Sequence, residues 1–160
     1  MSKPKVLLLG GVGFIGRNLV KYLVDKDLAS EIRVLDKLPT SLAFLSEDHK
    51  KAFSSPVVTV KQANLCSPQS IEKCFATEGT WDVVINLAAE TKYGQTEEVY
   101  KEKVLDVVKK CLEEGKKLKV KKWVEVSTAQ VYAPGGKVIY KNIKNFISIN
   151  FLFFIFGKSE

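Results

Sequence analysis

Three glycines, Gly10, Gly13 and Gly16, form the stretch of this sequence best suited to chemistry. They stand between an apolar run at 6–9 and a segment at 17–26 whose apolar residues recur at helical spacing. This pattern predicts a turn from a buried strand into a helix. Gly10 would permit the tight exit, Gly13 the close approach of a pyrophosphate, and Gly16 the close packing of the helix on the sheet. The anion would then lie on free N–H groups at the helix N-terminus. The alternative is an ordinary glycine-rich turn.

An acidic residue follows at the spacing that a dinucleotide site needs. Asp36 ends the second expected strand, at 31–35, and stands twenty residues beyond Gly16. A carboxylate at this point can accept both hydroxyls of an adenosine ribose and repels a 2′-phosphate, so the sequence favours NAD over NADP as the cofactor. Lys37 comes next and would soften that preference. The alternative role for Asp36 is to cap a turn.

Strands and helices alternate up to about residue 136. We expect further strands at 57–60, 81–89 and 123–126, and helices at 41–53, from Ser67 onward, and at 96–114 with Gly115 as the helix end. The alternation predicts an α/β fold, a doubly wound parallel sheet of Rossmann type that is truncated after about five strands. Residues 1–136 would be the NAD(P)-binding domain, and residues 137–160 an atypical tail rich in Phe, Ile, Lys and Asn.

The composition is that of a globular protein with an excess of basic residues. Hydrophobic residues make up 46% of the chain, and its net charge is +7. The densest basic run, at 116–122, lies between a helix and a strand, so we interpret it as a solvated helix end rather than a nucleic-acid surface. Three cysteines match no zinc or redox spacing and one histidine makes no metal site, so we expect reduced core thiols in a cytoplasmic protein.

Three stretches of the sequence carry a resemblance to a known family. These stretches resemble parts of extended short-chain dehydrogenases/reductases, the NAD-dependent epimerase/dehydratase family. The nucleotide fingerprint of that family corresponds to residues 9–16, and its fourth strand to residues 82–89. Its fifth strand, with the catalytic serine/threonine segment, corresponds to residues 124–132. The resemblance implies an oxidoreductase that acts on a small hydroxyl-bearing substrate such as a nucleotide sugar, in a chain that could form homo-oligomers. The alternative class is a non-catalytic dinucleotide-binding sensor or scaffold.

The resemblance also implies roles for individual residues. It places Gly10, Gly13, Phe14, Ile15 and Gly16 at the pyrophosphate, Asp36 at the ribose, Asn64 and Leu65 near the adenine, and Leu87, Ala88 and Ala89 along the cofactor. Thr128 matches the position of the family's catalytic hydroxyl. Two positions depart from the family pattern, because the adenine contact is usually an aspartate rather than Asn64, and Lys103 stands where an asparagine is usual.

The tail, residues 137–160, lacks the periodicity of the preceding chain. Tyr140 and Lys144 have the Tyr-x-x-x-Lys spacing of the family's catalytic pair, in which the lysine lowers the tyrosine pKa for proton exchange with the substrate hydroxyl. A second interpretation, a membrane element at 146–156, is disfavoured because this run is too short to span a bilayer. The third, a foreign end produced by splicing, early termination or a gene-model error, is the one we favour.

The tail also predicts how the protein behaves. Residues 151–156 are apolar, uncharged and free of proline, so they would either promote association or add a strand beside the fifth. A chain without a substrate lobe would not hold a substrate over the nicotinamide. We therefore expect cofactor binding without turnover of nucleotide sugars.

Overall fold

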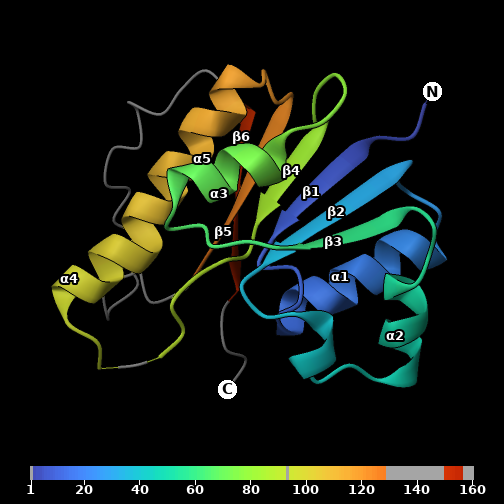
Figure 1. Cartoon of the computed structure of the whole chain (residues 1–160), viewed down its shortest axis with the longest axis horizontal. Helices are drawn as coiled ribbons and strands as arrows, with labels where there is room; N and C mark the ends of the chain where they lie inside the picture. Colours follow the sequence, from blue (N-terminus) through green and yellow to red (C-terminus); the bar gives the residue numbers. More distant parts are fainter. Residues whose placement is uncertain (1, 93, 129–149, 157–160) are drawn as a thin grey trace.

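The computed structural model describes residues 2–92, 94–128 and 150–156, which form one parallel sheet (Figure 1). The strand order is β3-β2-β1-β4-β5-β6. The strands are β1 (Lys5–Leu9), β2 (Glu31–Asp36), β3 (Val58–Gln62), β4 (Val83–Asn86), β5 (Lys122–Thr128) and β6 (Asn150–Phe156). Every pairing is parallel, so the predicted doubly wound fold is confirmed.

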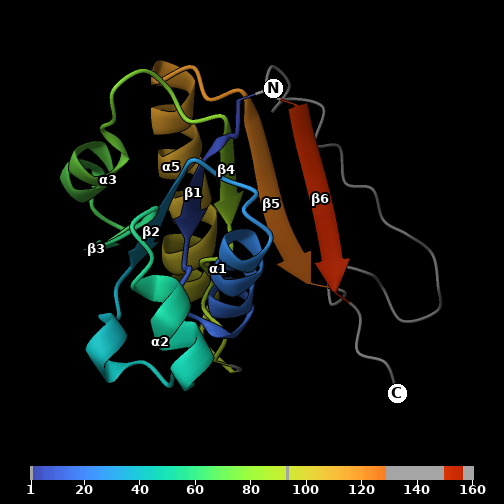
Figure 2. The ribbon, with the colours of Figure 1, turned by 90° about the vertical axis from the view of Figure 1, so that its right-hand side faces the viewer.

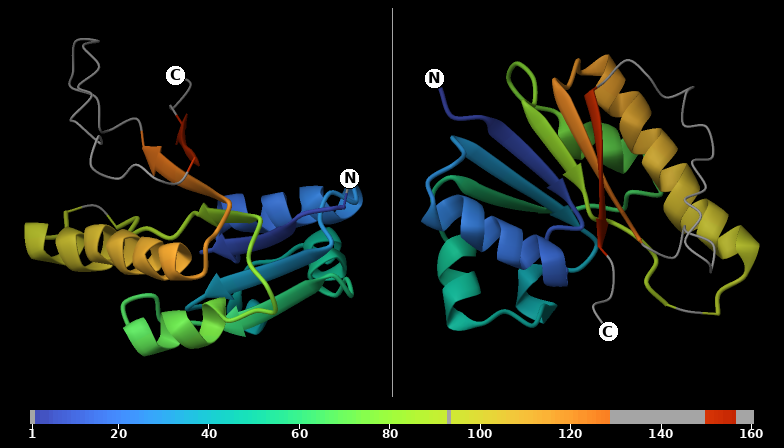
Figure 3. Two further views of the ribbon diagram at one scale, coloured as in Figure 1. Left: turned by 90° about the horizontal axis from the view of Figure 1, so that it is seen from above. Right: turned by 180° about the vertical axis from the view of Figure 1, so that it is seen from behind.

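Helices cover both faces of the sheet (Figures 1 and 3). The helices α1 (Phe14–Asp25) and α2 (Glu47–Phe53) pack on one face, and α3 (Pro68–Phe75) and α5 (Asp106–Lys117) pack on the other. Alternate residues of β1 enter the two cores, since Leu8 is buried with Val20 of α1 and Leu7 with Phe75 of α3. β1 is therefore a central strand buried on both faces, as its continuous apolar run predicts.

Two helical regions differ in detail from the prediction. In place of one helix at 41–53, the chain has a 3-10 turn (Thr40–Leu42) and α2, because Ala43 is extended and Ser46 caps a new helix. The hydroxyl of Ser46 accepts a hydrogen bond from the N–H of His49 at 3.3 Å. The long helix predicted at 96–114 is built from α4 (Glu97–Tyr100), a π-helical turn (Lys101–Leu105) and α5.

Gly115 does not end the last helix, contrary to the prediction, since α5 continues to Lys117. A Cβ on Gly115 would lie 3.1 Å from Cζ3 of Trp123, so the glycine allows α5 to pack closely on the indole of β5. The chain turns only at Lys119, which has a φ of 53°. Gly115 therefore serves packing rather than helix termination.

The strand β6 comes from the tail. It pairs with β5 from Lys122 opposite Asn150 to Thr128 opposite Phe156, and Figure 2 shows it at the edge of the sheet. The predicted alternative in which the tail adds a strand beside the fifth is confirmed. Tyr140 and Lys144 lie outside the described residues. Among the helices that are described, none has the length and apolar character needed to cross a membrane.

The direction in which the chain adds new strands to the sheet changes between β1 and β4, which are parallel neighbours. The chain adds β2 and β3 on one side of β1, and then crosses to add β4, β5 and β6 on the other side. The loops that follow β1 and β4 consequently leave the sheet in opposite directions, and a crevice opens beyond the carboxyl ends of these two strands. Ligands of open parallel sheets bind in such a crevice.

Candidate functional site: a pocket at the carboxyl edge of the sheet

The turn between β1 and α1 needs its glycines for different reasons. Gly10 has a φ of 73°, and a Cβ on it would lie 2.8 Å from the backbone N of Ala88. A Cβ on Gly16 would lie 2.4 Å from Cα of Gly11, so Gly16 packs the helix against the turn rather than against the sheet. A Cβ on Gly13 would have one atom within 4 Å, the carbonyl oxygen of Gly10 at 3.3 Å. The space at Gly13 is thus left open to a ligand.

The first turn of α1 is suited to an anion. Gly13 is the N-cap residue and offers no side chain to the free N–H groups of the helix, and the first turn holds no acidic residue. The N-terminal end of the helix dipole therefore faces the pocket uncompensated. The guanidinium of Arg17 lies over the Phe14 ring at 5.3 Å and donates a hydrogen bond to the carbonyl of Phe44 at 2.6 Å, which joins the helix start to the loop after β2.

Asp36 organises the turn and also lines the pocket. Its Oδ2 accepts a hydrogen bond from the N–H of Val12 at 3.0 Å, and its Oδ1 accepts one from the N–H of Leu38 at 3.0 Å. The turn-capping role is therefore present in the structure. Each carboxylate oxygen can accept a further hydrogen bond, so capping leaves the proposed ribose contact available.

The side chain of Asn64 is engaged in a turn of its own. Its Oδ1 accepts a hydrogen bond from the N–H of Cys66 at 3.0 Å, while its backbone N–H donates to the hydroxyl of Ser70 at 3.0 Å. The side chain of Asn64, which the family resemblance places near the adenine, thus also fixes the loop after β3. All three cysteines are free thiols: Cys74 and Cys111 are buried, whereas Cys66 is half-buried, packs against the core and also lines the pocket.

A buried polar chain supports the pocket wall behind β4. Asn86 is fully buried, and its Oδ1 accepts a hydrogen bond from the N–H of Ala88 at 3.0 Å. Its Nδ2 donates to Glu125 at 2.8 Å, and the indole N–H of Trp123 donates to the same carboxylate at 3.0 Å. Burial raises the pKa of Glu125 to about 7, although both hydrogen bonds act to lower it. The N–H of Ala88 in the pocket wall is therefore linked through Asn86 to the titratable, half-buried side chain of Glu125.

A lysine and a glutamate also reach the pocket. Lys103, in the π-helical turn, places Nζ 3.6 Å from Oε2 of Glu90. Glu90 follows the small residues after β4, and its Oε1 accepts a hydrogen bond from the N–H of Lys92 at 3.1 Å. Sequence reasoning noted Lys103 as a departure from the family and did not assign a role to Glu90. The position of Glu90 directly after Ala89 was the available signal.

All these features surround one pocket of about 740 Å³. The twelve residues predicted to contact the cofactor all line it: Gly10, Gly13, Phe14, Ile15, Gly16, Asp36, Lys37, Asn64, Leu65, Leu87, Ala88 and Ala89. The remaining lining residues are Ala63, Cys66, Glu90, Thr91, Lys92, Lys103 and Val107. The loops after four neighbouring strands, β1 to β4, contribute to it. The structure thus brings the predicted contacts together; that they bind a cofactor stays a prediction.

The predicted catalytic residues are only partly placed. Thr128 is the last residue of β5, so its backbone lies at the carboxyl edge of the sheet, as the pocket does. Tyr140 and Lys144 fall outside the described part of the chain. The catalytic roles of these three residues stay predictions.

A doubly wound parallel sheet with a glycine turn at its switch point defines a Rossmann-type dinucleotide-binding domain. Comparison with known proteins narrows the class. The sequence matches the NAD dependent epimerase/dehydratase family over residues 6–147, and the chain belongs to that family. The predicted family membership is confirmed.

Two curated relatives illustrate the family. The chain is 34% identical over 152 residues to the dTDP-D-glucose 4,6-dehydratase of Dictyostelium discoideum, which covers 91% of this chain and 33% of that protein. It is 30% identical over 121 residues to the sterol-4-alpha-carboxylate 3-dehydrogenase of Saccharomyces cerevisiae, which covers 69% of this chain and 33% of that protein. The chain thus spans about a third of the length of these relatives.

Solved structures confirm the fold. The UDP-Glc/GlcNAc 4-epimerase of Campylobacter jejuni superposes with a TM-score of 0.70 at 23% identity, over 84% of this chain and 40% of that one. The Bordetella bronchiseptica enzyme WbmG, solved in complex with NAD and UDP, superposes with a TM-score of 0.69 at 20% identity, over 86% and 41%. At these identities the likeness concerns the fold alone.

Proposed function

We propose that this chain binds NAD in the pocket at the carboxyl edge of the sheet. The observation that carries the proposal is the convergence of all twelve predicted contacts on one pocket at the switch point between β1 and β4. The residues present fit the cofactor, because Gly13 leaves open the space that a pyrophosphate needs and α1 directs free N–H groups toward it. Membership of an NAD-dependent family supports the same assignment.

Each part of the pocket would hold a different part of the cofactor. Gly13 and the first turn of α1 would bind the pyrophosphate, and the carboxylate of Asp36 would accept the adenosine ribose hydroxyls. Asn64 would lie beside the adenine, and Ala88 would line the path toward the nicotinamide. When bound, NAD supplies a hydride acceptor.

We further propose NAD rather than NADP, because the carboxylate of Asp36 would face the 2′ position of the ribose. Lys37 lines the same pocket and would reduce this preference without reversing it. Calorimetric titration with both dinucleotides tests both claims. Tighter binding of NAD is expected. Equal or tighter binding of NADP would reject the preference, and binding of neither would reject the site.

For the wider protein we propose chemistry on a hydroxyl-bearing substrate such as a nucleotide sugar. The Dictyostelium relative is named as a dTDP-D-glucose dehydratase, which supports this class. Thr128 would hold a substrate hydroxyl, and Tyr140 and Lys144 are the proposed proton-transfer pair. Incubation with NAD and a panel of UDP-, GDP- and dTDP-sugars, followed by NADH absorbance and product analysis, tests this. The chain alone is expected to show no turnover; turnover that is lost in both Thr128→Ala and Tyr140→Phe would overturn that expectation and assign the catalytic roles.

The free thiols support the proposed cytoplasmic location. All three cysteines are unpaired, and burial raises the pKa of the Cys111 thiol to about 12. A buried thiol of this kind is inert, which suits a protein of a reducing compartment.

A further inference from the structure

The pocket contains one ion pair whose two members would act on an anionic ligand in opposite directions. Lys103 reaches the pocket from the π-helical turn, and Glu90 reaches it from the loop after β4. Their charged atoms lie 3.6 Å apart. At the wall of a phosphate-binding pocket, a cation raises the affinity for phosphate because it attracts the anion, and a carboxylate lowers that affinity because it repels the anion.

The two side chains differ in their freedom to move. The Glu90 side chain is 9% exposed and is fixed by the hydrogen bond from Lys92, whereas the Lys103 side chain is 47% exposed. That hydrogen bond and the charge of Lys103 lower the pKa of Glu90, so the carboxylate stays ionised at neutral pH. The long, flexible lysine is therefore the member able to change partners.

Glu90 follows closely on the backbone that contacts the glycine turn, and both members of the pair line the same pocket as Gly10 and Gly13. Glu90 comes two residues after Ala88, whose backbone N lies 2.8 Å from the position that a Cβ on Gly10 would occupy. A π-helical turn is uncommon, and it inserts a residue that redirects the side chains of a helix. Here the turn occurs at Lys101–Leu105, the segment that carries Lys103 to the pocket.

We propose that Lys103 is a phosphate-binding residue of this pocket and that Glu90 competes with the bound phosphate for it. The proposal rests on the proposed function, since it needs a dinucleotide in the pocket. Without a ligand the ammonium group pairs with Glu90. When a pyrophosphate enters, the ammonium group turns to the phosphate oxygens, and the carboxylate remains as an opposing charge. Affinity is then set by the balance between the two residues.

The experiment measures NAD binding by calorimetry at several salt concentrations in wild type, Lys103→Gln and Glu90→Gln. Lys103→Gln should weaken binding about five- to tenfold, because a charge-assisted hydrogen bond is lost, and should reduce the salt dependence of the affinity. Glu90→Gln should strengthen binding about threefold, since the amide oxygen can still accept from the Lys92 N–H while the negative charge is gone.

Two matched controls separate local contacts from net charge. Lys109→Gln and Glu113→Gln make the same charge changes at exposed positions of α5 that lie outside the pocket. Both should leave the affinity within about twofold of wild type. Far-ultraviolet circular dichroism and thermal unfolding establish that every variant is folded.

Each outcome is decisive. Opposite shifts in the two pocket variants, with unchanged controls, support the proposal. If wild type binds NAD and the Lys103→Gln variant binds it with the same affinity, Lys103 does not bind the phosphate. Weaker binding in Glu90→Gln overturns the competition and makes Glu90 a positioning residue instead. Wild-type protein that binds no NAD rejects the proposed function itself.

Discussion

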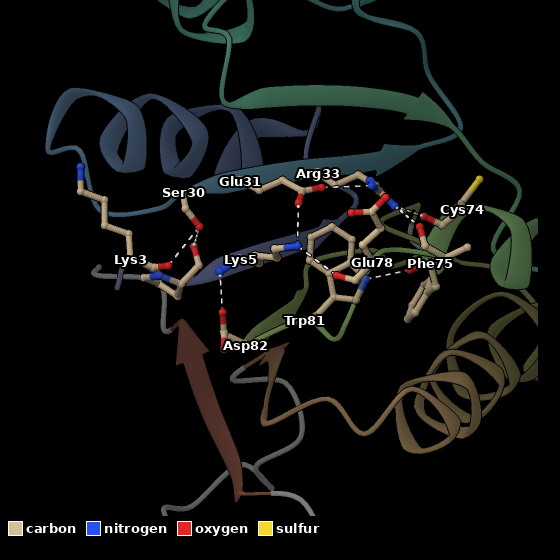
Figure 4. A network of polar contacts seen from close by, with 12 residues as sticks. Lys3, Lys5, Ser30, Glu31, Arg33, Cys74, Phe75, Glu78, Trp81 and Asp82 are labelled. Atoms are coloured by element: carbon tan, nitrogen blue, oxygen red, sulfur yellow. Dashed lines mark hydrogen bonds and ion pairs between the residues drawn. The ribbon is translucent and has the colours of Figure 1, made fainter. Parts of the chain in front are cut away.

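The two edges of the sheet use polar groups in different ways. At the amino-terminal edge the charged side chains pair with one another and with backbone carbonyls (Figure 4). The guanidinium of Arg33 stacks on Trp81 at 4.7 Å and donates to the carbonyl of Cys74 at 3.3 Å. Lys5 donates to the carbonyl of Glu78 at 3.0 Å. These contacts join β1 and β2 to the segment around Cys74 and Glu78.

At the carboxyl-terminal edge the donors are directed into open space. The N–H groups at the start of α1 have no side-chain cap, and Phe14 beside them is 74% exposed. A hollow exists at both edges, since Lys5, Glu31 and Arg33 help to line one of about 530 Å³ at the amino-terminal edge. Size therefore does not identify the ligand site. Unpartnered donors at a helix N-terminus and close-approach glycines do.

The largest effect is expected from Gly13→Val, which should weaken NAD binding at least about a hundredfold, close to 2.7 kcal/mol. The added side chain fills the space open at Gly13, where φ is −63°, a value open to residues with a side chain, and where the new Cβ has a single close contact, the Gly10 carbonyl oxygen at 3.3 Å. Calorimetry and urea unfolding should show lost binding with unchanged stability. Gly16→Ala is the contrasting variant and should unfold the domain, because its Cβ would lie 2.4 Å from Cα of Gly11. A folded Gly13→Val protein with normal affinity would make the motif an ordinary turn.

At the opposite edge, Arg33→Ala should reverse this pattern. It removes the stacking on Trp81 and the hydrogen bonds to two carbonyls, so the free energy of unfolding should fall by about 2 kcal/mol. The Kd for NAD should stay unchanged in the folded protein. Urea unfolding and calorimetry together check both results, and a selective loss of NAD affinity would break the division between the edges.

The half-buried carboxylate of Glu125 should make stability depend on pH. Its pKa is raised to about 7 in the folded protein from an ordinary 4.5, so the folded state binds the proton more tightly. The free energy of unfolding should thus decline as pH rises from about 4.5 to 7, by about 2.5 kcal/mol, and change little for this group above about pH 8. Urea unfolding at pH 5 and pH 8 measures the decline. The Glu125→Gln variant should lose this part of the pH-dependent decline in the free energy of unfolding. A decline of the same size in the variant would show that Glu125 is not the group responsible.

The smallest effect concerns the choice of cofactor. Asp36→Ala should narrow the difference between the NAD and NADP affinities by about fivefold, because the carboxylate that opposes a 2′-phosphate is removed. Lys37→Gln should widen it, since the neighbouring cation is lost. Calorimetric titration of each variant with both dinucleotides gives the ratio. Shifts of the same sign in the two variants would argue against a role for charge at this position.

Much of the site could be predicted because it depends on local rules. The glycine spacing, the strand before it and the acidic residue at the end of β2 together define the turn and one wall of the pocket. These features follow from backbone sterics and sequence distance, and the structure brings all the predicted contacts together. The five strands up to Thr128 were predictable for the same reason, since each is a short run that contains two or more Val, Leu or Ile residues.

The remaining features depend on contacts between distant residues. Gly115 has the residue type of a helix end, but its role is set by the Trp123 ring from another element. Lys103 pairs with Glu90 from a π-helical turn, and such a turn has no simple sequence signal. Likewise β6 lacks an alternating or family pattern, so the sequence offered a strand beside β5 only as one of two alternatives, and the pairing in the sheet decides between them.

The most direct test of the central claim is to map NAD binding on the two edges by NMR. Nitrogen-15-labelled protein would be titrated with NAD, and the backbone amide shifts would be followed residue by residue. We expect the largest changes in the glycine turn at 10–16 and at Ala88, with little change at Lys5, Arg33 and Glu78. Changes centred on the amino-terminal edge, or no saturable change anywhere, would contradict the account.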